Sequence, residues 1–171
     1  MHLLYNIDFG IASIIFLTVL LIYLRFDFSS KNRINHAFFS ILYCLILANV
    51  FDVITAISIS YSSMIPSLFN LILNEFYFAI LGAIGYHFIR YAYILIHRDL
   101  NQSILHFLSK LILLFYFIVL AINFSTGILI SFDANGNYIH GPLYAIVFII
   151  PYFFVTLAII LVMLKGKPFN T

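Results

Sequence analysis

The stretch LFNLILNEFYFAILGAIGYHFIRYAYILI, residues 68–96, decides the fold of this chain. It is almost entirely apolar and carries one acid, Glu75, and one arginine, Arg90. A helix needs about 20 mainly apolar residues to cross a bilayer. The stretch therefore predicts a transmembrane helix, long enough to tilt or to project beyond the membrane on the cytoplasmic side.

Four further apolar segments surround this one, at residues 9–26, 37–59, 104–130 and 143–164. The 171 residues are 64% hydrophobic and only 8% charged, whereas an ordinary soluble domain is roughly 25% charged. A soluble fold leaves too much surface exposed to hide so many apolar side chains. The sequence predicts an all-α integral membrane protein of about five transmembrane helices, forming a single domain over residues 1–171. No room is left for a soluble catalytic domain.

The cations predict the orientation of the helices. With the N-terminus placed outside, every lysine and arginine falls in or near a cytoplasmic loop or helix end; these are Arg25, Lys31, Arg33, Arg90, Arg98, Lys110, Lys165 and Lys167. The outer stretches 1–8, 60–67 and 131–142 contain none. This is the positive-inside pattern, and it favours a multi-pass protein of the bacterial cytoplasmic membrane with its C-terminus inside. Because no basic n-region precedes it, we interpret the first segment as a retained helix and not as a signal peptide.

Polar side chains gather at one depth of the predicted bundle. Asp52 and Glu75 each lie about 10–12 Å below the outer boundary, and acids inside a membrane usually face the protein interior or a water-filled cavity. We predict an outward-facing polar pocket between the second, third and fourth segments, built from Asn49, Asp52, Asn74, Glu75 and Asn123. An acidic pocket prefers a small cationic or hydrogen-bond-donating ligand, or protons. Interhelical hydrogen bonding that merely holds the bundle together and an ion path stay open as alternatives.

The loop before the last segment predicts a short extracellular β-hairpin over residues 130–140. Asn135-Gly136 is a strong turn dipeptide because both residues tolerate positive φ, and alternating polar and apolar residues flank it. Tyr138 and His140 on this hairpin are candidates for the lid of the pocket. The acidic and amide residues of the turn alternate as in a calcium loop, but the downstream bidentate acid is missing, so no metal site is predicted.

A second polar group, His87 and Arg90, lies deeper along the third segment, and we assign it to signal relay or packing. Gly82 and Gly85 form a strip of small residues with Ala79 and Ala83, which lets neighbouring helices approach closely. The sequence contains no phosphate-binding loop, no metal-ligand spacing and no nucleophile elbow. We therefore expect a protein that is not an enzyme, with no cofactor, and the absence of a basic run predicts no nucleic-acid partner.

Residues 123–144 carry a family resemblance. Asn123-Phe124-Ser125-Thr126-Gly127, an apolar stretch, and Gly136-Asn137-Tyr138-Ile139-His140-Gly141-Pro142-Leu143-Tyr144 follow in that order. The pattern resembles the N-terminal multi-helix membrane region of bacterial GGDEF diguanylate cyclases and related histidine kinases, notably from Firmicutes. His140 stands at a position that is often arginine in that pattern. Asn32-Arg33 before the second segment and Asp52 within it agree with the resemblance.

The resemblance implies a membrane-embedded sensor or input module. Such a module detects an extracytoplasmic or membrane-borne signal and relays it to a cytoplasmic output domain or partner protein, such as a diguanylate cyclase, which these 171 residues do not contain. Besides the lipid bilayer, a homodimeric partner is left open. The alternative is a small transporter or substrate-capture membrane subunit, followed by a structural or assembly subunit. Ligand and output are not readable from the sequence.

Overall fold

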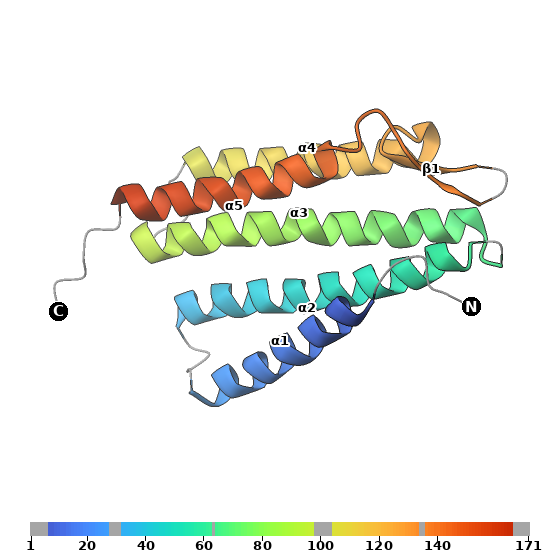
Figure 1. Cartoon of the computed structure of the whole chain (residues 1–171). Coiled ribbons are helices and arrows are strands. Elements are labelled where there is room, and N and C mark those ends of the chain that lie inside the picture. The colour runs from blue at the N-terminus through green and yellow to red at the C-terminus, as the bar shows by residue number, and fades with distance from the viewer. Residues whose placement is uncertain (1–6, 28–31, 63, 98–103, 134–135, 166–171) are drawn as a thin grey trace.

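The computed structural model describes residues 7–27, 32–62, 64–97, 104–133 and 136–165. Within these ranges the chain forms five helices and two short strands: α1 (Asp8–Asp27), α2 (Arg33–Ser60), α3 (Ser67–His97), α4 (Ile104–Thr126), β1 (Ile130–Phe132), β2 (Tyr138–His140) and α5 (Ile146–Lys165). All five helices are long and apolar enough to cross a membrane, and they form an elongated bundle (Figure 1). The predicted class, an all-α membrane protein with five long apolar helices, is confirmed.

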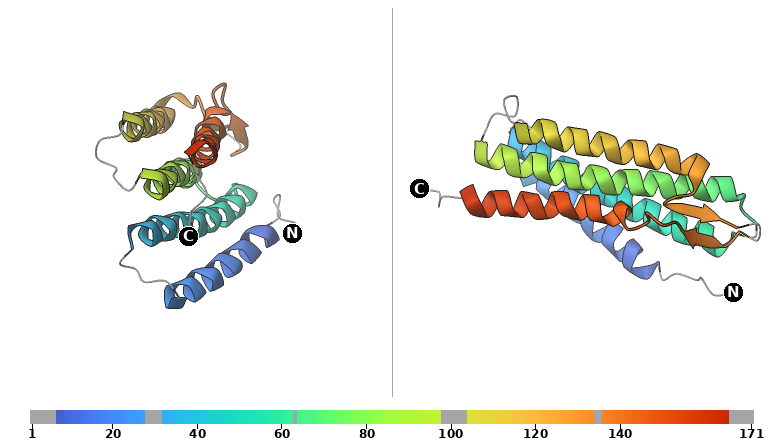
Figure 2. Two further views of the ribbon diagram at one scale, coloured as in Figure 1. Left: turned by 90° about the vertical axis from the view of Figure 1, so that its left-hand side faces the viewer. Right: turned by 90° about the horizontal axis from the view of Figure 1, so that it is seen from above.

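Helix α3 is the centre of the bundle. It packs against α2, α4 and α5 and also contacts β1, whereas α1 packs against α2; the end view in Figure 2 shows α3 between α2 and the pair formed by α4 and α5. A Cβ at Gly82 would meet the Tyr116 ring of α4, and one at Gly85 would lie 2.9 Å from the Pro151 carbonyl oxygen of α5. The prediction that small residues allow close helix approach is thus confirmed at both glycines.

The bundle has two apolar clusters, one in each half. Phe78, Tyr116 and Val147 belong to the cluster near the hairpin, and Ile89 and Phe154 belong to the one near the other end. Many other large apolar side chains are exposed along the helices. An exposed apolar surface of this extent suits lipid and not water.

A proline in α5 is matched by a tyrosine in α4. Pro151 has no backbone N–H, so the Val147 carbonyl four residues earlier loses its helical hydrogen-bond donor. The hydroxyl of Tyr116 lies 3.4 Å from that carbonyl oxygen and 2.8 Å from the carbonyl oxygen of Phe78 in α3. One buried hydroxyl therefore joins three helices.

Three predicted helix boundaries differ from the observed ones by more than one residue. Helix α4 was predicted to reach residue 130 but ends at Thr126, because Gly127 adopts a φ of +63°, a common way to terminate a helix. Helix α2 starts at Arg33 and not near residue 37, because Asn32 caps it by accepting a hydrogen bond from the Ile34 amide at 3.1 Å. Helix α5 starts at Ile146 and not at 143, because residues 142–145 form turns.

The strands β1 and β2 pair antiparallel, with Ile130 opposite His140 and Phe132 opposite Tyr138. Their connection is closed by Asp133 and Asn137: the Asn137 amide donates to the Asp133 carboxylate at 2.8 Å, and the Asn137 side chain donates to the same carboxylate at 2.8 Å. Gly136 has a φ of +80°, whereas Asn135 lies outside the described residues. The pairing covers the stretch for which a hairpin was predicted; its extracellular placement stays a prediction.

The described cations share one end of the bundle. Helices α1, α3 and α5 begin at the hairpin end and run away from it, while α2 and α4 run toward it (Figure 1). Each described lysine and arginine accordingly occupies the half of its helix remote from the hairpin: Arg25, Arg33, Arg90, Lys110 and Lys165. Lys31, Arg98 and Lys167 lie outside the described residues. The described lysines and arginines, which the sequence analysis assigned to one side of the membrane, therefore lie toward one end of the folded bundle.

Candidate functional site

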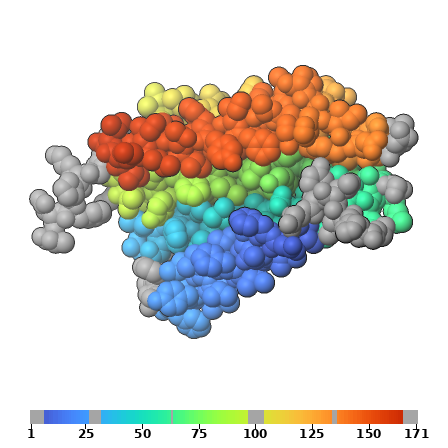
Figure 3. Space-filling view, in the orientation of Figure 1, coloured from blue at the N-terminus to red at the C-terminus, as the bar shows by residue number. Residues whose placement is uncertain are grey.

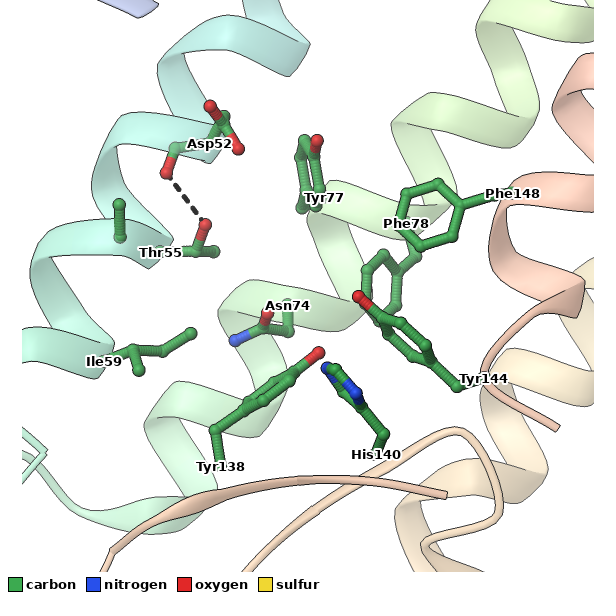
Figure 4. A pocket seen from close by; sticks show the side chains of 11 residues that line it. Asp52, Thr55, Ile59, Asn74, Tyr77, Phe78, Tyr138, His140, Tyr144 and Phe148 are labelled. Carbon is green, nitrogen blue, oxygen red and sulfur yellow. Dashed lines mark hydrogen bonds between the residues drawn. The ribbon is translucent and has the colours of Figure 1, made fainter. Parts of the chain in front are cut away.

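A pocket of about 300 Å³ lies near the hairpin end, between α2, α3, the hairpin and α5 (Figure 4). Helices α2 and α5 both pack on α3, and Figure 3 shows the surface of α3 in the gap between them. Each of these elements contributes to the lining: Asp52, Thr55, Ala56, Ile59, Asn74, Tyr77, Phe78, Tyr138, His140, Tyr144 and Phe148. Asp52 and His140 are exposed, so the pocket is open to the surface.

One wall of the pocket is polar. The Thr55 hydroxyl donates to the backbone carbonyl of Asp52 at 2.9 Å, and the Asp52 carboxylate lines the pocket, where it hydrogen-bonds with the Tyr77 side chain. Tyr77 extends beside that carboxylate (Figure 4). Asn74 donates its amide to the Asn70 carbonyl of its own helix at 2.8 Å, so its side-chain oxygen is left as a hydrogen-bond acceptor.

The opposite wall is aromatic and continuous. The His140 ring stacks on Tyr144 with centroids 3.9 Å apart, and it meets Tyr138 edge-on at 5.2 Å. Tyr144 in turn contacts Phe148 at 5.4 Å and Phe78 at 6.4 Å. These rings connect the hairpin with the first turns of α5. Any molecule in the pocket faces a carboxylate on one side and stacked rings on the other.

The pocket contains four of the seven predicted ligand-binding residues, namely Asp52, Asn74, Tyr138 and His140. Glu75 and Asn123 do not line it, and the prediction of one shared cavity between the second, third and fourth segments is wrong for them. Asn74 and Glu75 are consecutive, so they point about 100° apart around α3. Asn74 faces the pocket, while Glu75 faces α4 and bonds to Asn123. Helix α5 supplies the wall that was assigned to α4.

Asn49 is also absent from the pocket lining. Its side-chain amide donates to the Leu45 carbonyl of its own helix at 2.8 Å. A polar residue within a helix often satisfies itself in this way. Its position one turn from Asp52 did not bring the two side chains into one site, and the prediction for Asn49 is corrected.

Asn123 holds the loop that leads into the hairpin. Its side-chain oxygen accepts from the Leu129 amide at 2.7 Å and from the Ile130 amide at 3.2 Å. Its side-chain nitrogen donates to the Ile130 carbonyl at 3.2 Å and to Glu75 at 2.5 Å. For these two residues the alternative of interhelical hydrogen bonding describes the structure. Ser58 and Asn70 form a similar link between α2 and α3.

His87 belongs to a ring cluster remote from the pocket. It meets Tyr86 at 5.8 Å, and Tyr86 stacks on His106 of α4 at 6.0 Å. His87 and Arg90 lie 13 and 16 residues beyond Asn74 on α3, or about 20–24 Å along the helix. The contacts of His87 are those of a packing residue, and a relay role for the pair stays a prediction.

Tyr77, Tyr144 and Phe148 are site residues that the sequence analysis missed. The sequence analysis assigned them no ligand-binding role. One signal was present: Tyr77 follows Asn74 by three residues, a spacing that places both on one face of α3. The other necessary fact, that α5 and not α4 faces Asp52, is a matter of tertiary packing.

Comparisons with protein-family models, curated proteins and solved structures find no match for this chain. The fold and hydropathy define its class, a multi-pass α-helical membrane protein. The resemblance of residues 123–144 to the input regions of diguanylate cyclases stays a prediction.

Proposed function

We propose that this chain is a membrane-embedded sensor module whose pocket binds a small organic cation from the extracytoplasmic side. The observation that carries the proposal is the pairing of the Asp52 carboxylate with the rings of Tyr77, Tyr138 and Tyr144 in one pocket. Aromatic faces attract ammonium groups through their quadrupole, and quaternary ammonium ligands are commonly held by such rings. The carboxylate supplies the opposite charge.

The distribution of the cations supports an extracytoplasmic position for the pocket. The hairpin end carries none of the described lysines or arginines, and cytoplasmic ends are the ones enriched in them. In this orientation the hairpin covers the outer end of the pocket, and Tyr138 and His140 act as its lid. Helix α5 then runs from the pocket toward the cytoplasm.

Helix α5 is the candidate for relaying the signal. Phe148 lines the pocket, and Pro151 follows it within one turn. Helices tend to bend where a proline removes a hydrogen bond. A ligand that displaces Phe148 therefore acts within one turn of the position where α5 bends most easily. The cytoplasmic half of α5 carries that displacement to an output domain or partner protein.

The packing below the pocket favours a sensor over the alternative, a small transporter or substrate-capture subunit. Ile89, Ala92, Phe154 and Ala158 are buried together in the half of the bundle remote from the hairpin. This apolar cluster closes the path from the pocket along α3 and α5. A transported cation would have to separate these helices.

The test is binding of tetramethylammonium to the full chain in lipid nanodiscs, measured by calorimetry. We expect Asp52→Asn and Tyr144→Leu each to weaken binding by about tenfold or more, equivalent to about 1.4 kcal/mol. Tyr23→Leu is the matched control, because Tyr23 is exposed on α1 and does not line the pocket. Equal binding of an uncharged compound of the same shape, such as neopentane, would refute the cation site.

A second measurement separates sensing from transport. Hydrogen exchange on α5 beyond Pro151 should change when tetramethylammonium is added, and labelled tetramethylammonium should not accumulate in vesicles that contain the protein. Accumulation without a change in exchange would support the transporter instead.

A further inference from the structure

A second cavity lies on the other side of α3, between α3 and α4. Its volume is about 220 Å³, and it is lined by Ile72, Glu75, Phe76, Ala79, Phe117, Leu120, Ala121 and Phe124. Every lining residue other than Glu75 is apolar. The cavity shares no residue with the Asp52 pocket.

Glu75 is nearly fully buried, with 5% of its surface exposed. One carboxylate oxygen, Oε1, accepts from the Asn123 amide at 2.5 Å. The other, Oε2, has no hydrogen-bond partner among the described residues. Burying a carboxylate oxygen without a hydrogen-bond partner costs free energy. A hydrogen-bond donor placed beside Oε2 would lower that cost.

Among the residues that the structure describes, no lysine or arginine on α3 or α4 lies near Glu75. Arg90, the nearest one on α3, is fifteen residues further along the helix, or about 22 Å away. On α4, Lys110 is thirteen residues from Asn123, or about 20 Å. No described lysine or arginine of α3 or α4 is therefore available as a partner for the Glu75 carboxyl group.

The cavity faces the lipid. Phe76 is 56% exposed, and Phe117 and Phe124 on α4 are also exposed, so its rim belongs to the apolar outer surface of the bundle. Helix α4 contacts the bundle mainly through α3. A molecule dissolved in the bilayer can reach Glu75 without passing through water.

We propose that this cavity is a second binding site, one that takes a lipophilic primary amine from the membrane. The apolar lining accepts the hydrocarbon part, and the ammonium group donates an N–H to Oε2 of Glu75 while it balances the charge. A quaternary ammonium ion lacks that N–H and does not fit this site. A neutral alcohol of the same length lacks the charge.

The test uses a decylamine that carries a photoreactive diazirine on its chain, with the full protein in lipid vesicles and peptide mapping after illumination. We expect labelling to concentrate on residues 72–79 and 117–124. Excess decylamine should reduce it by about tenfold, while decanol and tetramethylammonium should not. Labelling spread evenly over the lipid-facing surfaces of all helices, or equal competition by decanol, would overturn the proposal.

Variants locate the effect at the carboxylate and separate the two sites. Glu75→Gln should remove the advantage of decylamine over decanol, and Asp52→Asn should leave the labelling unchanged while it weakens tetramethylammonium binding. If Glu75→Gln does not fold, the comparison of decylamine with decanol on the unaltered protein still decides. Failure of the Asp52 experiments alone would contradict the proposed sensor pocket and not this site.

Discussion

The Tyr116 hydroxyl occupies a point where three helices meet. It lies within hydrogen-bond distance of a carbonyl oxygen in α3 and of the α5 carbonyl that Pro151 leaves without a donor. The ring fills the space that Gly82 leaves open on α3. One side chain therefore compensates for two irregularities of its neighbours, a missing Cβ and a missing N–H.

Tyr116→Phe should lower the free energy of unfolding by about 1 kcal/mol, the usual net contribution of a buried hydrogen bond. The ring stays, so packing against Gly82 is retained and the loss isolates the hydroxyl. Unfolding in mixed detergent micelles, followed by circular dichroism, measures it. Tyr23→Phe is the control, because Tyr23 on α1 is 62% exposed; an equal loss in both variants would contradict the assigned role.

The polar residues show which properties of a single position can be predicted from the sequence. Asp52 and Asn74 were correctly placed in one pocket with Tyr138 and His140, because depth along antiparallel helices follows from simple counting. Glu75 was misplaced, because depth does not specify which face of α3 a residue occupies. The face that a residue occupies depends on which helix packs there. Because apolar residues lie on every side of α3, the sequence pattern does not distinguish its faces.

At the scale of helices and strands, the position of the hairpin depends on the side-chain amide of Asn123 in α4. The Asn123 side chain accepts from the Leu129 and Ile130 amides and donates to the Ile130 carbonyl. At the end of α4, the Gly127 amide donates to the backbone carbonyl of Asn123 at 2.9 Å. The hairpin is thus positioned from its base, where it leaves the bundle, as well as by its own strand pairing.

Asn123→Ala should loosen this base while it leaves the helices in place. Hydrogen exchange of the Leu129 and Ile130 amides should accelerate by about fivefold or more, because each loses a bond of about 1 kcal/mol or more when its partner is removed. Ser125→Ala is the control, since the Ser125 hydroxyl bonds only within its own helix, to Ile122, at 3.0 Å. Unchanged protection at residues 129–130 would show that the strands alone hold the loop.

The helices themselves were largely predictable from the sequence, because each needs only length and apolar composition. The end of α4 was not. Residues 127–130 are as apolar as the helix before them, so hydropathy continues where the backbone turns. The turn depends on the conformation of Gly127 and on the side-chain bonds of Asn123, and neither changes the hydropathy profile.

For the molecule as a whole, the testable question is its orientation. In a Cys44→Ser background, Asn137→Cys on the hairpin should react with a membrane-impermeant maleimide added to intact cells. Lys165→Cys at the end of α5 should react only after the cells are opened, because the cation-bearing end is expected inside. Reaction of both cysteines from the same side would contradict the five-span arrangement with N-terminus outside.

Asn74 and Glu75 are neighbours in sequence that serve two different faces of α3, so one helix is the common wall of two cavities. A small rotation of α3 that suits an occupant on one side alters the fit on the other. Equilibrium then demands reciprocity: if an amine beside Glu75 changes the affinity for a cation beside Asp52 by some factor, the cation changes the affinity for the amine by the same factor. The lipid content of the bilayer would in this way set how sensitively the protein responds to the outside.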